Sequence, residues 1–73
     1  MEKFHLIFIP TDKKGLIISM EYTCRNVDAA CEYATMQLLF SNGQFREAHV
    51  CQTWKSEVTF REAIDPIIVT NNI

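Results

Sequence analysis

The sequence predicts an α+β domain of two layers, in which one α-helix packs across one face of a mainly antiparallel β-sheet in the order β-β-α-β-β. Residues 16–24 carry apolar side chains at every second position, as a half-buried strand does. Residues 27–40 place apolar side chains at helical spacing, and short apolar runs flank both segments. With 73 residues, the chain is expected to form a single domain over 1–73.

A hairpin is expected at the start of the chain. Its first strand covers residues 3–9, where the run KFHLIFI stops at Pro10, which has no backbone donor. In TDKKG, Asp12 and Gly15 occupy the first and last positions of a type I turn. The second strand, over residues 16–24, has one face formed by Leu16, Ile18, Met20, Tyr22 and Cys24.

The helix is expected from about Val27 to Phe40. Asn26 is a good N-cap, and Asp28 in the first turn complements the positive end of the helix dipole. Asn42 or Gly43 can adopt the left-handed conformation that ends a helix. The stripe expected to face the core is Val27, Ala30, Cys31, Ala34 and Leu38, and a second apolar stripe beside it is Ala29, Tyr33, Met36 and Phe40.

The tetrapeptide FREA occurs twice, at residues 45–48 and 60–63. Read as strands, REAHVCQT and EVTFREAI form an antiparallel hairpin around Trp54, in which Val50 faces Phe60. The two copies are then opposite arms of one hairpin and not a repeated unit. The tail IIVTNN is expected to add a short edge strand.

A helical second copy is the alternative. Thr59 and Glu62 match a capping box, which favours a helix start. The strand is preferred because β-branched and aromatic residues precede this copy and because Asp65-Pro66 would end a helix after about one turn.

Composition limits the partners and the compartment. A formal net charge of −2 provides neither a basic footprint for phosphate backbones nor the acidity of a DNA mimic. Cys24, Cys31 and Cys51 are odd in number and have no paired spacing, which favours a reduced, cytoplasmic compartment. The run FHLIFIP is too short for a membrane span, so no membrane partner is expected.

Catalysis has one candidate pair. His49 and Cys51 lie two residues apart on a predicted strand and point to the same side, where an imidazole could lower a thiol pKa. A small enzyme using this pair is an alternative, but no glycine-rich oxyanion loop or third orienting residue accompanies it. The chain is therefore expected not to be an enzyme.

No cofactor or metal is expected. The cysteines lack the close pairs that structural zinc sites use. Gly15 and Gly43 are the two glycines, and neither lies in a phosphate-binding pattern.

Nucleic-acid binding is a second alternative, because single-strand binders combine cations with aromatic stacking. Glutamates interleaved along the same hairpin would cancel most of its positive field. The candidate residues are Arg46, Arg61, Lys55 and Trp54.

Protein binding is the leading hypothesis. On the sheet face opposite Phe4, Leu6 and Phe8, apolar residues could form an exposed patch. Alternatively, the C-terminal PIIV covers them, or they are apolar residues that the surface tolerates singly. The partner is a second copy of this chain or another protein. The residues expected at the interface are Tyr33, Met36 and Phe40 on the helix, Ile7, Ile9 and Ile17 on the sheet, and Trp54 at the turn.

In its element order the chain resembles very small bacteriophage accessory proteins, among them antitoxins and anti-CRISPR inhibitors. The resemblance rests on FHLIFIP, the hairpin into LIISMEYTC and the helix NVDAACEYATMQLLF. Such proteins are generally non-enzymatic and occupy a surface on a host enzyme or nucleoprotein complex. The resemblance implies a phage or mobile-element protein that modulates a host factor in the host cytoplasm. Many members that mimic DNA are far more acidic than this chain.

Overall fold

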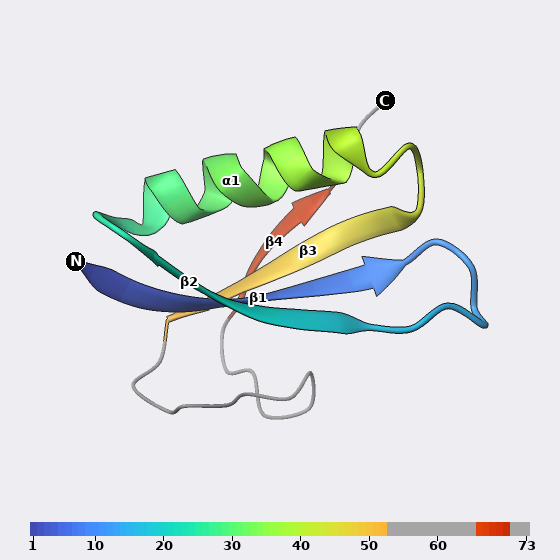
Figure 1. The fold of residues 1–73 in the computed structure, drawn as a ribbon, viewed down its shortest axis with the longest axis horizontal. Helices are drawn as coiled ribbons and strands as arrows, with labels where there is room; N and C mark the ends of the chain where they lie inside the picture. The colour runs from blue at the N-terminus through green and yellow to red at the C-terminus, as the bar shows by residue number, and fades with distance from the viewer. Residues whose placement is uncertain (53–65, 71–73) are drawn as a thin grey trace.

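The computed structural model describes residues 1–52 and 66–70. Within these ranges the elements are β1 (Glu2–Pro10), β2 (Ile18–Cys24), α1 (Val27–Phe40), β3 (Phe45–Gln52) and β4 (Ile67–Thr70). The strands form one antiparallel sheet in the spatial order β2-β1-β3-β4, and α1 lies along one side of it (Figure 1). The predicted α+β class and the order β-β-α-β-β are confirmed.

β1 and β2 form the predicted hairpin. Phe4 lies opposite Tyr22, and Phe8 lies opposite Ile18. The turn closes where the Gly15 amide donates to the Asp12 carbonyl at 2.9 Å. A Cβ atom on Gly15 would come within 2.6 Å of the Pro10 Cβ, so the tight return of the chain requires glycine at this position.

α1 has the predicted bounds, and its ends have the predicted caps. The Asn26 Oδ1 accepts a hydrogen bond from the Ala29 amide at 2.9 Å. At the other end, Asn42 and Gly43 adopt φ angles of 56° and 83° in the left-handed region. The Thr11 hydroxyl then donates to the Gly43 carbonyl at 2.7 Å, which ties the loop after α1 to the end of β1.

The larger buried cluster combines side chains of α1 with side chains of β1, β2 and β3. Ala30, Ala34 and Leu38 are buried, as the predicted core stripe requires, and Val27 and Cys31 pack against them. Small alanines allow the helix backbone to approach the strands closely. Within the described residues, no helix combines the length and the apolar character needed to cross a membrane. The buried cluster is Phe4, Leu6, Phe8, Cys24, Ala30, Ala34, Leu38, Ala48 and Val50.

The neighbours of β3 correct one prediction. Val50 pairs with Leu6 of β1 on one side and with Ile67 of β4 on the other. Both edges of β3 are therefore occupied at Val50, and the predicted pairing of Val50 with Phe60 is wrong. The predicted edge strand in the tail is confirmed as β4. The second FREA copy, in either its strand or its helical interpretation, lies outside the described residues.

Candidate interaction surfaces

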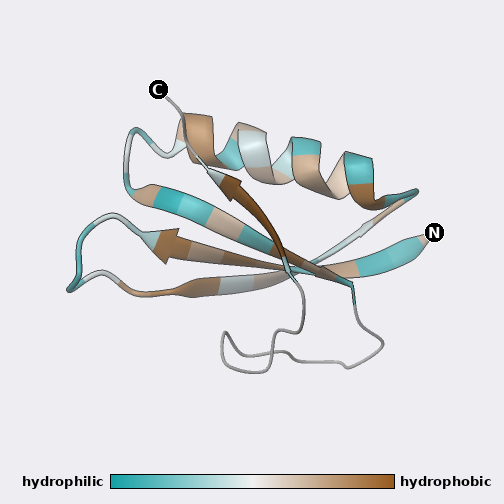
Figure 2. Cartoon of the chain, turned by 180° about the vertical axis from the view of Figure 1, so that it is seen from behind, coloured by the Kyte–Doolittle hydropathy of each residue, from teal (hydrophilic) through white to brown (hydrophobic). Residues whose placement is uncertain are grey.

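The outer side of α1 carries three large apolar side chains near its C-terminal end. Met36 is 50% exposed, Leu39 is 47% exposed and Phe40 is 70% exposed. Residues three and four positions apart on a helix are surface neighbours, so Leu39 and Phe40 both lie beside Met36. We call these three residues the helix patch. In Figure 2 the ribbon of α1 is brown at its C-terminal end, next to the loop that leads into β3.

The helix patch lacks Ala29 and Tyr33 of the predicted second stripe and adds Leu39. Met36 and Phe40 belong to both, whereas Leu39 was not predicted. The spacing of Leu39 from Met36 was a usable signal, because a step of three residues also keeps side chains on one helix face.

Tyr33 has a different role from Met36 and Phe40. Its ring stacks on the ring of Tyr22 in β2, with 4.1 Å between ring centroids and 9° between ring planes. Tyr33 is half-buried and packs against the core. One face of its ring is thus used within the molecule, where it joins α1 to β2.

The sheet face opposite α1 corrects another prediction. Ile7 is 0% exposed and Ile9 is 6% exposed, so the expectation of an exposed apolar patch is wrong for both. β1 is an interior strand, and Ile7 lies between Ser19 of β2 and His49 of β3. The IIV segment of the tail joins the sheet beside β3 and does not lie across this face. Ile7, Ile9 and Cys51 form a second buried cluster.

The chain segment that enters β2 is exposed and apolar. Leu16 is 83% exposed, and Ile17 and Ile18 are each about half exposed. We call Leu16, Ile17 and Ile18 the edge segment. Ile17 is accordingly accessible, as predicted. Leu16 and Ile18, which alternation places on the other face of the strand, are accessible too.

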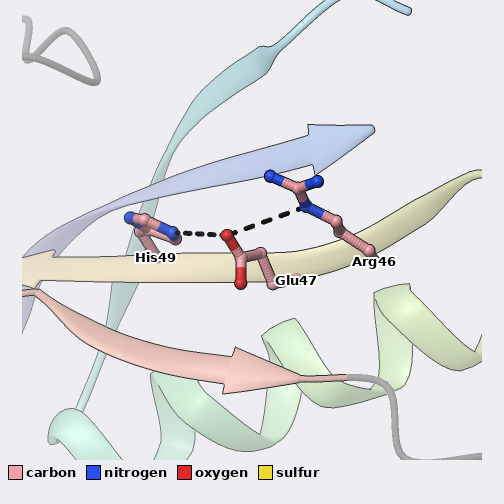
Figure 3. A network of polar contacts seen from close by, with 3 residues as sticks. All are labelled: Arg46, Glu47 and His49. Carbon is pink, nitrogen blue, oxygen red and sulfur yellow. Dashed lines mark hydrogen bonds and ion pairs between the residues drawn. The ribbon is translucent and has the colours of Figure 1, made fainter. Parts of the chain in front are cut away.

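Arg46 lies beside a carboxylate. Its Nε is 3.9 Å from the Glu47 Oε1, and the same oxygen is 3.3 Å from the His49 Nε2 (Figure 3). The Glu47 carboxylate offsets part of the positive field that the nucleic-acid hypothesis assigns to Arg46. The other residues of that hypothesis, Arg61, Lys55 and Trp54, lie outside the described residues.

The thiol of Cys51 is shielded from solvent. Cys51 is buried, and the residue opposite it on β1 is His5, which is also buried. Burial raises the pKa of the Cys51 thiol above its ordinary value. A nucleophilic cysteine needs the opposite shift, because the thiolate is the reactive form. His49 and Cys51 do lie on one face of β3, but the environment favours the neutral thiol.

The other cysteines also remain thiols. Cys24, Cys31 and Cys51 are all free. Burial raises the pKa of Cys31, and the nearby Asp28 and Cys24 raise it further. No group of three or more histidine, cysteine, aspartate or glutamate side chains close enough to hold a metal ion occurs in residues 1–52 and 66–70.

Comparisons with known proteins give no relative. No family model, no curated protein and no solved structure matches this chain.

Proposed function

We propose that this protein is a small non-catalytic interaction module, and that the helix patch is its binding surface for another protein. A single observation carries the proposal: Met36, Leu39 and Phe40 are exposed together on the side of α1 that faces away from Ala30, Ala34 and Leu38. Contiguous exposed apolar side chains commonly mark interaction sites. Anchors at positions i, i+3 and i+4 are the pattern by which a helix docks into an apolar groove.

The chemistry of the helix patch suits protein recognition. Phe40 offers a large apolar ring, and Met36 is a flexible side chain that adapts to irregular surfaces. The patch contains no charged residue, so most of its binding energy would come from apolar burial. The partner is therefore a protein with an exposed apolar groove.

The partner that we propose is a host factor, and the compartment is the cytoplasm. The element order that resembles small phage accessory proteins favours a host factor, which the module would modulate or inhibit. Three free thiols suit a reduced compartment, so we place this interaction in the cytoplasm.

Two observations favour a binding module over the alternatives. The raised pKa of Cys51 disfavours an enzyme that uses its thiolate. The contact of Arg46 with Glu47 disfavours a cationic surface for nucleic acid.

The test uses three variants of the full chain. Met36→Glu and Phe40→Glu each put a charge into the helix patch, and Thr35→Glu puts the same charge on an exposed position next to it. Proteins captured from a bacterial lysate by each immobilised variant are quantified by mass spectrometry. A captured protein is then purified, and its Kd is measured by calorimetry. We expect both patch variants to raise Kd by about tenfold or more, which corresponds to the loss of one interface hot spot.

Two controls make this outcome decisive. Thr35→Glu should leave Kd within about twofold of the unmodified chain, and thermal melts should show that all three variants are folded. If the patch variants bind every captured protein as tightly as Thr35→Glu does, the helix patch is not the binding surface and the proposal fails.

A further inference from the structure

The two edge strands of the sheet, β2 and β4, differ in length and in sequence. β4 has 4 residues and follows Pro66, whereas β2 has 7 residues. Natural edge strands avoid pairing with other chains by being short or by carrying proline and lysine. β2 contains neither proline nor lysine, and Glu21 is its one charged residue. Its outer edge has no strand partner within the described residues.

The sequence pattern also extends beyond the strand. Apolar residues occupy every second position from Leu16 to Cys24, but β2 begins at Ile18. Continuing the register in which Phe8 lies opposite Ile18 would place Pro10 opposite Leu16. Pro10 cannot donate a ladder hydrogen bond, so β1 gives the start of this segment little support. A strand on the other side of β2 would supply that support to the edge segment.

We propose that the missing strand is β2 of a second copy of this chain, paired antiparallel about a two-fold axis at Met20. The sheets of the two copies then become continuous. Residues directly opposite each other in an antiparallel pair point to the same face, so both α1 helices lie on the same side of the joined sheet. Each residue pairs with the residue equally far on the other side of the axis. These pairs are Leu16 with Cys24, Ile17 with Thr23, Ile18 with Tyr22, Ser19 with Glu21, and Met20 with Met20.

The position of the axis follows from length and charge. An axis at Met20 is the centre of residues 16–24, so every residue of the alternating segment gains a partner from the same segment. An axis one residue later would place Glu21 opposite Glu21 of the second copy. Directly opposed like charges destabilise a strand pair, whereas the axis at Met20 places Ser19 opposite Glu21.

The gain would matter for a chain of this size. Domains of this length have small cores and are commonly stabilised by a second subunit. Pairing would cover the backbone edge of β2 and the exposed side chains of the edge segment. The edge segment and the helix patch share no residue, so this inference does not rest on the proposed function.

The test exploits the proposed pairing of Ser19 with Glu21. Ser19 is exposed and belongs to neither buried cluster, so its replacement should leave both clusters intact. Ser19→Glu creates two symmetry-related like-charge pairs in the dimer, while Ser19→Lys creates two opposite-charge pairs. Sedimentation equilibrium of the full chain is expected to show a dimer. Ser19→Glu should raise the dimer Kd roughly threefold or more, and Ser19→Lys should lower it or leave it unchanged.

A charge exchange identifies the register. Adding Glu21→Lys to Ser19→Glu restores opposite charges across the axis, and this double variant should recover the dimer Kd of the unmodified chain. The exchange also removes the contact between Lys3 and Glu21, at 3.7 Å, so thermal melts must show that the double variant is folded. Met36→Glu and Phe40→Glu should not change dimerisation.

Three results would overturn the inference. One is a monomer throughout the millimolar range. Another is a dimer that responds equally to Ser19→Glu and Ser19→Lys, since that dimer would lack the proposed pairing. The third is a dimer that Met36→Glu or Phe40→Glu dissociates, because its interface would then be the helix patch.

Discussion

The reactivity of the Cys51 thiol is determined by its burial. The thiol is buried on the sheet face opposite α1, next to Ile7 and Ile9. A thiolate is charged and loses its hydration there, so burial raises the thiol pKa. The neighbouring imidazole of His49 has a carboxylate partner, Glu47, within 3.3 Å. At neutral pH, Cys51 is therefore a protonated, apolar side chain.

Reactivity with a thiol reagent tests this assignment. In the native protein at pH 7.5, we expect iodoacetamide to modify half-buried Cys31 first and Cys51 much more slowly, because Cys51 is buried and its pKa is raised. Mass spectrometry of digested samples over time measures each site. Denatured protein is the control, in which both sites should react at similar rates.

Fast modification of native Cys51 would contradict this expectation. It would indicate an accessible thiolate and would favour the enzyme hypothesis based on His49 and Cys51.

Single residues also show what the sequence could not predict. Alternation correctly separated Ile7 and Ile9 from Phe4, Leu6 and Phe8, because the pleat alone determines which face a side chain takes. Whether that face is buried depends on which other parts of the chain pack there. The periodicity of a single strand carries no information about this packing.

Among the elements, α1 was predicted most completely. Its bounds, its Asn26 cap and its left-handed ending depend on neighbouring residues, and local rules are sufficient for them. The start of β2 was predicted two residues early, at Leu16, because the alternation continues past the point where β1 can support it. The pairing of Val50 was wrong because the choice between Phe60 and Ile67 as its neighbour is a tertiary one.

The close packing of α1 predicts that a larger side chain at Ala34 destabilises the protein. Ala34 of α1 is fully buried and belongs to the core cluster that includes Phe4, Leu6 and Val50 of the sheet. Ala34→Leu should therefore push the helix away from the strands and lower the free energy of unfolding by about 1–3 kcal/mol. Urea denaturation followed by circular dichroism measures the change.

Thr35→Leu is the matched control for Ala34→Leu. It adds a leucine at the exposed neighbouring position, where the change should stay within about 0.5 kcal/mol. An Ala34→Leu variant as stable as this control would show that α1 is not closely packed on the sheet.

For the whole molecule, stability should fall in alkaline solution. Cys31 and Cys51 both have thiol pKa values raised from the ordinary value of 9.0. The folded state therefore holds these protons more tightly than the unfolded state does. Between the unfolded and folded pKa values the native state binds more protons, so the free energy of unfolding decreases as pH rises. The contribution is fully present below pH 9.0 and is lost above it.

Thermal melts at pH 8 and at pH 10 measure this loss. The Cys31→Ala/Cys51→Ala double variant is the control, because it lacks both raised thiols and should show a smaller decrease in Tm over the same interval. Equal decreases in the two proteins would assign the alkaline loss to other groups.

The position of β1 between β2 and β3 affects how the chain folds during translation. One neighbour, β2, follows immediately, but the other, β3, starts at Phe45. During synthesis, the apolar run of β1 would leave the ribosome and stay open along one edge until most of the chain had followed. Unpaired strand edges of this kind promote aggregation of partly folded chains. The yield of folded protein should therefore depend on how fast β3 is delivered, and slow translation between β2 and β3 would prolong the exposure of β1.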